Sequence, residues 1–423
     1  MKMRLGMISQ WYDPESGSAA VAGGICRSLA ALGHEMHVLT GFPNYPTGRI
    51  YPGYRMRPYQ YERRSGVHVH RVPLIPSHDR SAVRRATTYL SFGASAAARH
   101  RILRSVDAWL VFSTPATVAL PALVAHALYR RPYVLLIQDL WPDTVVESRF
   151  VRPGRMLRTA VRGIHAFCDA TYRSAAAVVV TAPGMAGVLA GRGVPAGKLS
   201  VVPNWVDESV YRPVGRDRAL ARRLGLDGSF VVMYAGSLGD LQGLDAAIDA
   251  VRLLPDLPDL RLVFVGSGVA EHRLRDAARG LDRVLFLGQQ PPGRMADLMA
   301  LSDVQLISLK DLPLFHATLP SKVQATLAAG RAIVGSVPGD AADLIARSGA
   351  GLTVPPGDPP ALAAAIRHLH GLGAAACAAM GSAGHRFYLD HLSARVGGGA
   401  LADTLRRAAA RDPVPTHPKG TRP

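Results

Sequence analysis

Short apolar runs alternate along this chain with longer stretches in which apolar residues recur every three or four positions. Brief runs bounded by Gly, Pro or Asp are typical of buried strands, and the longer periodicity is typical of helices that bury one face. In the first half, strands are predicted over 3–8, 36–40, 67–72, 109–112, 133–137, 177–180 and 200–202. In the second half, they are predicted over 230–234, 261–265, 284–287, 304–309, 332–336 and 351–354.

This alternation predicts an α/β protein, because parallel strands need a crossover long enough to hold a helix. Two series in tandem predict two doubly wound, Rossmann-like domains facing each other across a cleft, with ligands at the carboxyl ends of the strands. We expect the first domain over 1–204 and the second over 205–390, since Pro203 punctuates the chain there. A C-terminal helix is expected over 391–410, with a return to the first domain as one option, followed by a disordered tail over 411–423.

The stretch Leu314–Val334, LFHATLPSKVQATLAAGRAIV, holds a candidate anion site. Pro320 is expected as the first helical residue, with Ser321 and Lys322 in the opening turn and Gly330 as a left-handed cap. A strand, loop and helix start in this order aim free backbone N–H groups at an anion. Ser321 would add a hydroxyl and Lys322 a cation. The alternative is an ordinary crossover helix with a solvated lysine.

The charge of the chain favours a polyanionic partner. The 423 residues carry a formal net charge of +18, which suits nucleic acid, anionic lipid or a phosphorylated substrate. Few aromatic residues lie among the basic ones, which argues against nucleic acid. A composition that is 48% hydrophobic and 19% charged excludes global disorder. A coding bias towards Arg is the alternative source of the charge.

Cysteine usage and hydropathy indicate a cytoplasmic protein. The three cysteines are far apart, so a reducing compartment is expected, and no signal peptide is evident. Residues 109–129 are interpreted as a strand, a turn and a helix rather than a membrane span. Residues 80–104 and 149–173 interleave Arg with apolar positions. They predict either peripheral binding to the inner, anionic membrane surface or helices with a solvated basic face.

Glycine-containing turns follow several predicted strands. Gly17-Ser18 follows the first, and Gly236, Ser237 and Gly239 follow 230–234. Glycine lets a backbone approach a phosphate closely, although each turn also fits a plain strand-to-helix connection. No turn completes G-x-G-x-x-G, which disfavours an NAD(P) oxidoreductase.

The sequence predicts no metal site and no cofactor. It contains no Asp-x-Asp tripeptide, and its His and Asp residues lack metal-ligand spacing. A bound diphosphate would therefore be neutralised by helix N-termini, Lys310 and Lys322 rather than by a metal ion.

Five motifs occur in a characteristic order: GFPNYPTGRIYPGY (41–54), QDLWPD (138–143), PNWVD (203–207), YAGSLGDLQGL (234–244) and LPSKVQATLAAGRAIV (319–334). Together they resemble a family-four glycosyltransferase of the two-Rossmann-domain (GT-B) type. The subgroup that they resemble most is the bacterial O-antigen and capsule N-acetyl amino-sugar transferases, such as the N-acetylfucosaminyl type.

The resemblance implies metal-independent transfer of a sugar from a UDP-sugar, with retention at the anomeric carbon. In the family, two glutamates eight positions apart flank the helix start, and the second holds the donor ribose. Here His316 and Gln324 occupy those positions. Gln324 can still hydrogen-bond a ribose hydroxyl as a neutral amide. His316 either orients the donor sugar or is a loop residue. The basic pair of the family is replaced by Ser237 and Gln242, so Lys322 is expected to bind the diphosphate.

In the first domain, Asp139 and Asp143 follow a strand, where they can bind acceptor hydroxyls or assist proton transfer. Asp139 could instead cap the following turn. Gln138 stands where many relatives carry a histidine, so no histidine base is assigned; the donor phosphate itself can take the proton. Asn44 and Tyr45 either line the acceptor side or form a rigid turn fixed by proline.

The acceptor is expected to be lipid-linked or a small glycoside, in surface polysaccharide or natural-product biosynthesis. Because His316 and Gln324 depart from the family pattern, a second hypothesis stays open. It is a catalytically degenerate relative that binds a nucleotide sugar or a partner protein without turnover.

Overall fold

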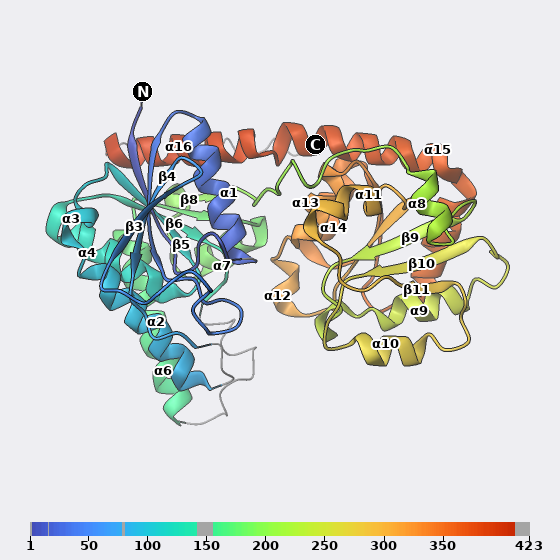
Figure 1. The fold of residues 1–423 in the computed structure, drawn as a ribbon, viewed down its shortest axis with the longest axis horizontal. Coiled ribbons are helices and arrows are strands. Elements are labelled where there is room, and N and C mark those ends of the chain that lie inside the picture. The colour runs from blue at the N-terminus through green and yellow to red at the C-terminus, as the bar shows by residue number, and fades with distance from the viewer. Residues whose placement is uncertain (1, 16, 78–80, 142–154, 411–423) are drawn as a thin grey trace. The chain divides into compact units, whose positions relative to one another are not determined.

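A computed structural model describes residues 2–15, 17–77, 81–141 and 155–410 (Figure 1). The predicted tail over 411–423 and the candidate residue Asp143 lie outside this part of the chain. The molecule divides into two compact units. The first comprises Met1–Pro203 with Gly397–Pro423, and the second comprises Asn204–Val396.

The first unit is built on one sheet with the strand order β3-β4-β2-β1-β5-β6-β7-β8. Its strands are β1 Arg4–Ile8, β2 Glu35–Gly41, β3 Gln60–Arg64, β4 Val67–Val72, β5 Ala108–Ser113, β6 Tyr133–Ile137, β7 Ala177–Val180 and β8 Leu199–Val201. Only the edge pair β3–β4 is antiparallel among these described strands. Every residue of β5, β6 and β7 is buried, because helices cover both faces of a parallel sheet.

Helices lie on both faces of this sheet in Figure 1. They are α1 Ser18–Ala31, α2 Ala82–Ala97, α3 His100–Leu103, α4 Leu120–Tyr129, α6 Arg155–Ser174 and α7 Pro183–Gly191, with the 3₁₀ turns η1 Ala116–Ala119 and η2 Ala196–Lys198. The last helix, α16 Ala394–Ala410, belongs to this unit from Gly397 onward. Where Gly398 lies, an added methyl group would be 3.2 Å from the Cβ of Ser28 on α1, so the two helices are in close contact.

The second unit has an all-parallel sheet with the order β11-β10-β9-β12-β13-β14. Its strands are β9 Phe230–Ala235, β10 Leu260–Val265, β11 Val284–Phe286, β12 Val304–Ser308, β13 Ala332–Ser336 and β14 Gly351–Val354. Its helices are α8 Arg218–Arg223, α9 Asp245–Arg252, α10 Glu271–Ala277, α11 Met295–Met299, α12 Pro313–His316, α13 Ser321–Ala328, α14 Gly339–Ser348 and α15 Pro359–His391, with the turns η3 Asp240–Gln242 and η4 Pro292–Arg294.

The predicted fold class is confirmed, since the chain forms two doubly wound α/β sheets. Every strand predicted from the apolar runs is present, and residues 109–129 form β5, η1 and α4 as expected. None of the described helices is long and apolar enough to cross a membrane. The antiparallel edge strand β3 was not predicted, because its sequence QYERR is polar and only partly buried.

The predicted start of the central helix is wrong by one residue. α13 begins at Ser321, and Pro320 precedes it with an extended backbone (φ −67°, ψ 134°). The Pro320 carbonyl accepts a hydrogen bond from the Val323 N–H at 2.9 Å. Pro320 is therefore the N-cap, which keeps a non-helical backbone while its carbonyl accepts the first bond of the helix.

Candidate functional site

The turns after β9 and β10 meet the first turn of α13 in the second unit. Gly236 has φ 145°, and a methyl group there would lie 2.3 Å from Cε of Lys322 and 3.1 Å from its Nζ. A methyl group at Gly266 would lie 1.9 Å from the Gly236 carbonyl oxygen. Glycine at both positions is what allows the two turns and the lysine side chain to pack this closely.

The Lys322 ammonium is a desolvated cation with no anionic partner among the residues that the structure describes. Burial lowers its pKa, because a low-dielectric surrounding disfavours the charged form. Its Nζ lies 5.2 Å from the centre of the Tyr234 ring. Within the described ranges, no hydrogen bond or ion pair reaches this ammonium. An anionic ligand at this place would favour the charged form of Lys322.

Gln324, two positions after Lys322, is only 1% exposed. Its Oε1 atom has no hydrogen-bond partner among the residues that the structure describes. A buried acceptor without a donor is unfavourable by about 1–3 kcal/mol, which makes it a candidate for binding a ligand hydroxyl.

The loop after β9 is held by hydrogen bonds to the end of β12. The hydroxyl of Ser308 donates to the Gln242 carbonyl at 2.6 Å, and the N–H of Lys310 donates to the Leu241 carbonyl at 2.9 Å. The Tyr234 hydroxyl donates to the carbonyl of Ser237 at 2.7 Å. Gly239, within this loop, lies against Gln242, since a methyl group there would be 2.6 Å from its Oε1. The residues of this loop that are predicted to bind the nucleotide-sugar donor therefore lie in a loop whose backbone is held in place by these hydrogen bonds.

The imidazole of His316 is engaged in a surface pair. Its Nε2 lies 2.7 Å from Oδ1 of Asp311, and both side chains are more than half exposed. The backbone of His316 packs against Gly339, where a methyl group would be 2.1 Å from the His316 carbonyl oxygen. This contact fixes the end of α12. A role for the imidazole on a donor sugar stays a prediction.

In the first unit, the predicted glycine turn adjoins the predicted acceptor loop. Gly17 (φ 70°) is the N-cap of α1, and a methyl group on it would be 3.5 Å from the Tyr45 ring. Asn44 is 2% exposed, and its Nδ2 donates to the Phe42 carbonyl at 2.9 Å. That bond supports the rigid-turn interpretation of Asn44. The side chain of Ser18 is not among those described.

A buried carboxylate that the sequence did not reveal organises these two loops. Glu15 is 3% exposed and accepts hydrogen bonds from the N–H groups of Tyr12 (3.0 Å), Asn44 (2.7 Å) and Tyr45 (2.7 Å). Burial raises the pKa of Glu15, and the three N–H donors oppose that rise. The only signal in the sequence is a glutamate beside a glycine turn, and that signal is common.

Asp139 lies directly after β6 and is tied to the neighbouring strand. The hydroxyl of Thr114, which follows β5, donates to Oδ2 of Asp139 at 2.8 Å. Burial raises the pKa of this carboxyl group above its usual range, and the Thr114 bond partly counteracts the rise. Such a carboxyl group can accept a hydrogen bond or a proton from a ligand hydroxyl.

Four partly exposed aromatic rings form a row in the first unit. Ring centres lie 5.4 Å apart for Trp11 and Tyr45, 6.3 Å for Trp11 and Tyr89, and 6.2 Å for Tyr89 and Trp141. Trp11, Tyr45 and Trp141 follow β1, β2 and β6 in the chain. Aromatic rings offer apolar area together with polar edges, which suits an amphipathic ligand. Only Tyr45 of this row was expected from the sequence.

Comparisons with known proteins cover both units. Residues 16–205 match the family described as "Glycosyl transferase 4-like domain", and residues 229–371 match "Glycosyl transferases group 1". WcaI of Escherichia coli (strain K12), a glycosyl transferase named for colanic acid biosynthesis, is 28% identical over 75% of this chain and 79% of its own length. The GDP-mannose-dependent alpha-mannosyltransferase of Mycobacterium tuberculosis is 26% identical over 84% of this chain and 85% of its own.

Among solved structures, Alr3699/HepE of Anabaena in complex with UDP has a TM-score of 0.72 at 17% identity, covering 96% of this chain and all of its own. The chain is a family-four glycosyltransferase with the GT-B fold. The glycosyltransferase therefore uses a nucleotide sugar as donor. The structure brings together Gly236 and Lys322 in its second unit, and Gly17 and Tyr45 in its first. Ser321, which begins α13, and Lys310, which follows β12, are both exposed.

Proposed function

We propose that this glycosyltransferase transfers an N-acetylated amino sugar from a UDP-sugar to a lipid-linked or small glycoside acceptor, with retention and without a metal ion. The observation that carries the proposal is Lys322, a desolvated ammonium that lies against the Gly236 turn and has no anion beside it in the described part of the chain. The negative charge of a bound diphosphate would pair with this ammonium group. The amino-sugar and UDP assignments rest on the motif resemblance and on the UDP complex of HepE.

Different residues would bind the donor and the acceptor. Lys322 and the start of α13 would hold the diphosphate, and Gln324 Oε1 would accept a hydrogen bond from a ribose hydroxyl. Asp139 would orient the acceptor hydroxyl. As the bond from the anomeric carbon to the phosphate oxygen breaks and the bond to the acceptor oxygen forms on the same face, the acceptor proton passes to the departing phosphate. The protein then positions the reactants and stabilises charge.

The donor assignment is tested by nucleotide release. Purified protein is mixed with UDP-N-acetylhexosamines, UDP-glucose and GDP-mannose, each with polyprenyl-linked and simple glycoside acceptors, and products are identified by mass spectrometry. We expect UDP release and product with an N-acetylated donor. Turnover with GDP-mannose alone, as the mycobacterial relative's name would suggest, would contradict the UDP assignment.

The diphosphate site is tested by Lys322→Ala. This variant should weaken UDP binding by about 1–3 kcal/mol, the scale of a lost hydrogen bond to a charged group. Arg279→Ala is the charge-matched control, because Arg279 is a highly exposed cation of the same unit that pairs with Asp276. Calorimetry that gives equal UDP affinity for both variants would remove Lys322 from the site.

The second candidate function is binding without turnover. It is favoured by the engagement of His316 with Asp311 and by the amide at position 324. Under that hypothesis, UDP binds, no donor is consumed, and Gln324→Glu restores no activity.

A further inference from the structure

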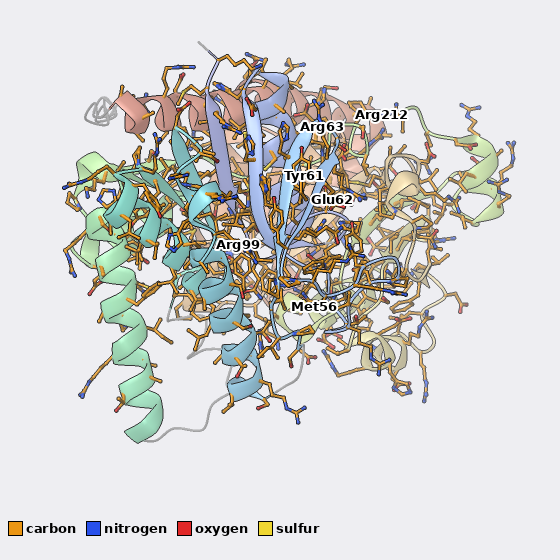
Figure 2. All side chains as sticks on the ribbon, turned by 60° about the vertical axis from the view of Figure 1, so that its left-hand side comes forward. Met56, Tyr61, Glu62, Arg63, Arg99 and Arg212 are labelled. Carbon is orange, nitrogen blue, oxygen red and sulfur yellow. The ribbon has the colours of Figure 1, made fainter. Side chains whose placement is uncertain are left out.

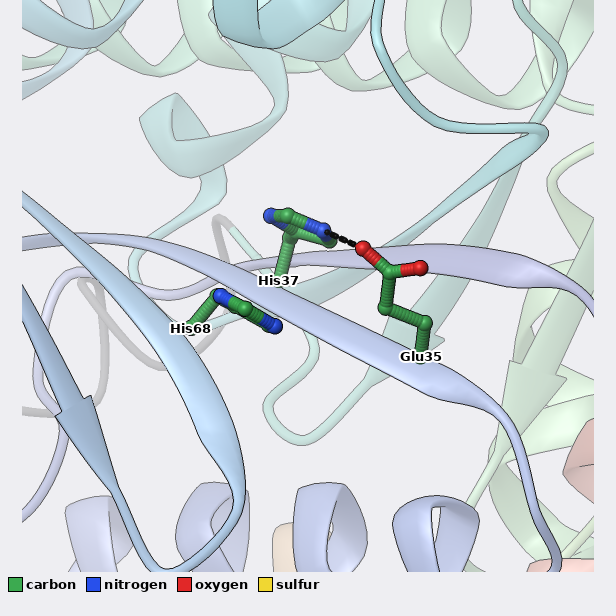
Figure 3. A group of neighbouring side chains, drawn as sticks. All are labelled: Glu35, His37 and His68. Carbon is green, nitrogen blue, oxygen red and sulfur yellow. Dashed lines mark hydrogen bonds and ion pairs between the residues drawn. The ribbon is translucent and has the colours of Figure 1, made fainter.

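A polar cluster outside the candidate site lies at the amino ends of β2 and β4 (Figure 3). Glu35 and His37 are two positions apart on β2 and therefore point to the same face of the sheet. The parallel register places His68 of β4 directly beside His37. One carboxylate oxygen and one ring nitrogen from each histidine lie within 4.8 Å of one another. These are three potential metal ligands from two neighbouring strands.

Both imidazoles have a partner on their outer nitrogen. Nδ1 of His37 lies 3.0 Å from Nε2 of His70, and Nδ1 of His68 lies 2.8 Å from the hydroxyl of Tyr61. Tyr61 is on the edge strand β3 and is labelled in Figure 2. Nδ1 of His70 lies 2.9 Å from the hydroxyl of Tyr59. When Nδ1 of each ring carries the proton, Nε2 of His37 and of His68 is an acceptor. In the other tautomer of His37, Nε2 donates to Oε1 of Glu35, 2.9 Å away, and a bound ion would take the place of that proton (Figure 3). This outer support is the arrangement found around metal-binding histidines.

The guanidinium of Arg4 lies beside two of the three potential ligand atoms. Its Nε lies 3.0 Å from Nε2 of His37 and 3.2 Å from Oε1 of Glu35, while those two acceptor atoms are 2.9 Å apart. One cationic N–H thus serves both. The side chain of Arg4 is 45% exposed, so it can move into solvent without leaving a buried charge.

We propose that Glu35, His37 and His68 form a binding site for a divalent ion of the zinc type, for which the guanidinium of Arg4 competes. Two imidazoles and one carboxylate are a ligand set that Zn²⁺ accepts, with a further position open to water. The rings of His37 and His68 are stacked, with centres 4.6 Å apart and planes at 11°. Binding therefore requires one ring to turn until both Nε2 atoms face the ion. That ring is His68, because its Nδ1 partner Tyr61 is 50% exposed and can move with it, whereas His37 is buried.

The proposed ion would act on stability rather than on sugar transfer. Asn44 and Tyr45 follow the carboxyl end of β2, whereas Glu35 begins that strand. An ion at Glu35 would join β2 to β4 near the edge of the sheet and so stabilise the first unit. This site was not expected from the sequence, because strand pairing rather than local spacing brings its ligands together.

The full chain, without a histidine tag, is titrated with Zn²⁺ against a chromogenic chelator, and Co²⁺ is used as a spectroscopic probe. We expect one tight equivalent, which His68→Ala and Glu35→Gln weaken at least tenfold. Arg4→Gln should instead raise the affinity several-fold, because it removes the competing cation. Zn²⁺ should also raise the melting temperature of the unmodified protein and not that of Glu35→Gln.

His370→Ala is the matched control, since His370 also faces a carboxylate, with its Nε2 3.0 Å from Asp259 in the second unit. It should keep the tight equivalent. Circular dichroism confirms that each variant is folded. Equal Zn²⁺ affinity in His68→Ala and the control, or the absence of any tight equivalent in the unmodified protein, would overturn the proposal.

Discussion

By the motif resemblance, the amide at position 324 stands where the family carries a carboxylate. Its oxygen is buried and without a partner in the described structure, so the residue has kept the acceptor and lost the charge. A neutral acceptor forms weaker bonds to a hydroxyl than a carboxylate does. The loss of the charge also avoids the large cost of burying an unpaired anion while the site is empty.

Gln324→Leu should selectively remove recognition of the ribose. We expect the unmodified protein to bind UDP more tightly than 2′-deoxy-UDP or 3′-deoxy-UDP by about 1 kcal/mol, the net value of one hydrogen bond. In Gln324→Leu, that difference should vanish. Calorimetry with the three nucleotides measures it, and a difference that persists in the variant would place the ribose elsewhere.

Asp139 combines a raised pKa with one hydroxyl donor, and these define its pH behaviour. If the ionised form binds the acceptor hydroxyl, kcat/KM for the acceptor should fall as the pH drops through the raised pKa. Thr114→Val removes the donor that favours the ionised form, so the acid limb of the profile should move to higher pH. Thr117→Val, which removes a hydroxyl bonded to the Tyr89 carbonyl, should leave the limb in place. An unmoved limb in Thr114→Val would exclude Asp139 as the titrating group.

At the scale of elements, the turns after β9 and β10 pack so closely that they require glycine at positions 236 and 266. A methyl group at Gly236 meets the flexible end of the Lys322 side chain, whereas one at Gly266 meets the rigid Gly236 carbonyl. The first clash can be relieved by moving the lysine. The second requires the turns themselves to separate.

Gly236→Ala and Gly266→Ala should therefore fail in different ways. Both glycines have a positive φ, 145° at Gly236 and 138° at Gly266, so each substitution carries a backbone cost of about 1–3 kcal/mol in the free energy of unfolding. Beyond this shared cost, Gly236→Ala should mainly reduce UDP affinity, because it displaces the Lys322 side chain. Gly266→Ala should have the larger effect on the free energy of unfolding in urea. Gly293→Ala is the control, because an added methyl group there meets nothing within 4 Å. Equal stability of the two test variants would contradict the packing seen here.

The sequence predicts those features of these elements that depend on residues close together in the chain. The apolar runs determine strands such as Tyr133–Ile137, and the motifs place Lys322 at the start of a helix. Glu15 could not be found in this way, because its three partners are backbone N–H groups whose position depends on the tertiary fold. The same holds for Trp11 and Trp141, which come near Tyr89 only through the packing of helix α2 against the sheet.

For the whole molecule, the formal charge of +18 favours an anionic partner but does not identify it. The first unit offers a specific candidate surface on α2. Val83 is 75% exposed and Leu90 is 57% exposed, and seven positions separate them, so both lie on one face of the helix. The exposed Arg84 follows Val83, and Arg101 and Arg104 of the next segment are also exposed. Apolar side chains beside cations suit the surface of an anionic bilayer.

We accordingly predict that the protein binds vesicles containing phosphatidylglycerol and does not bind vesicles of phosphatidylcholine alone. Binding should weaken between about 0.1 M and 1 M salt, because the Debye length falls from about 10 Å to about 3 Å. Leu90→Ser should reduce partitioning about tenfold, the value of roughly 1.4 kcal/mol of lost apolar burial. Leu253→Ser, at a 49% exposed position of the second unit, should not. Co-sedimentation with vesicles measures the binding in each case. Equal loss in both variants would show that the charge of the chain, rather than the face of α2, determines binding.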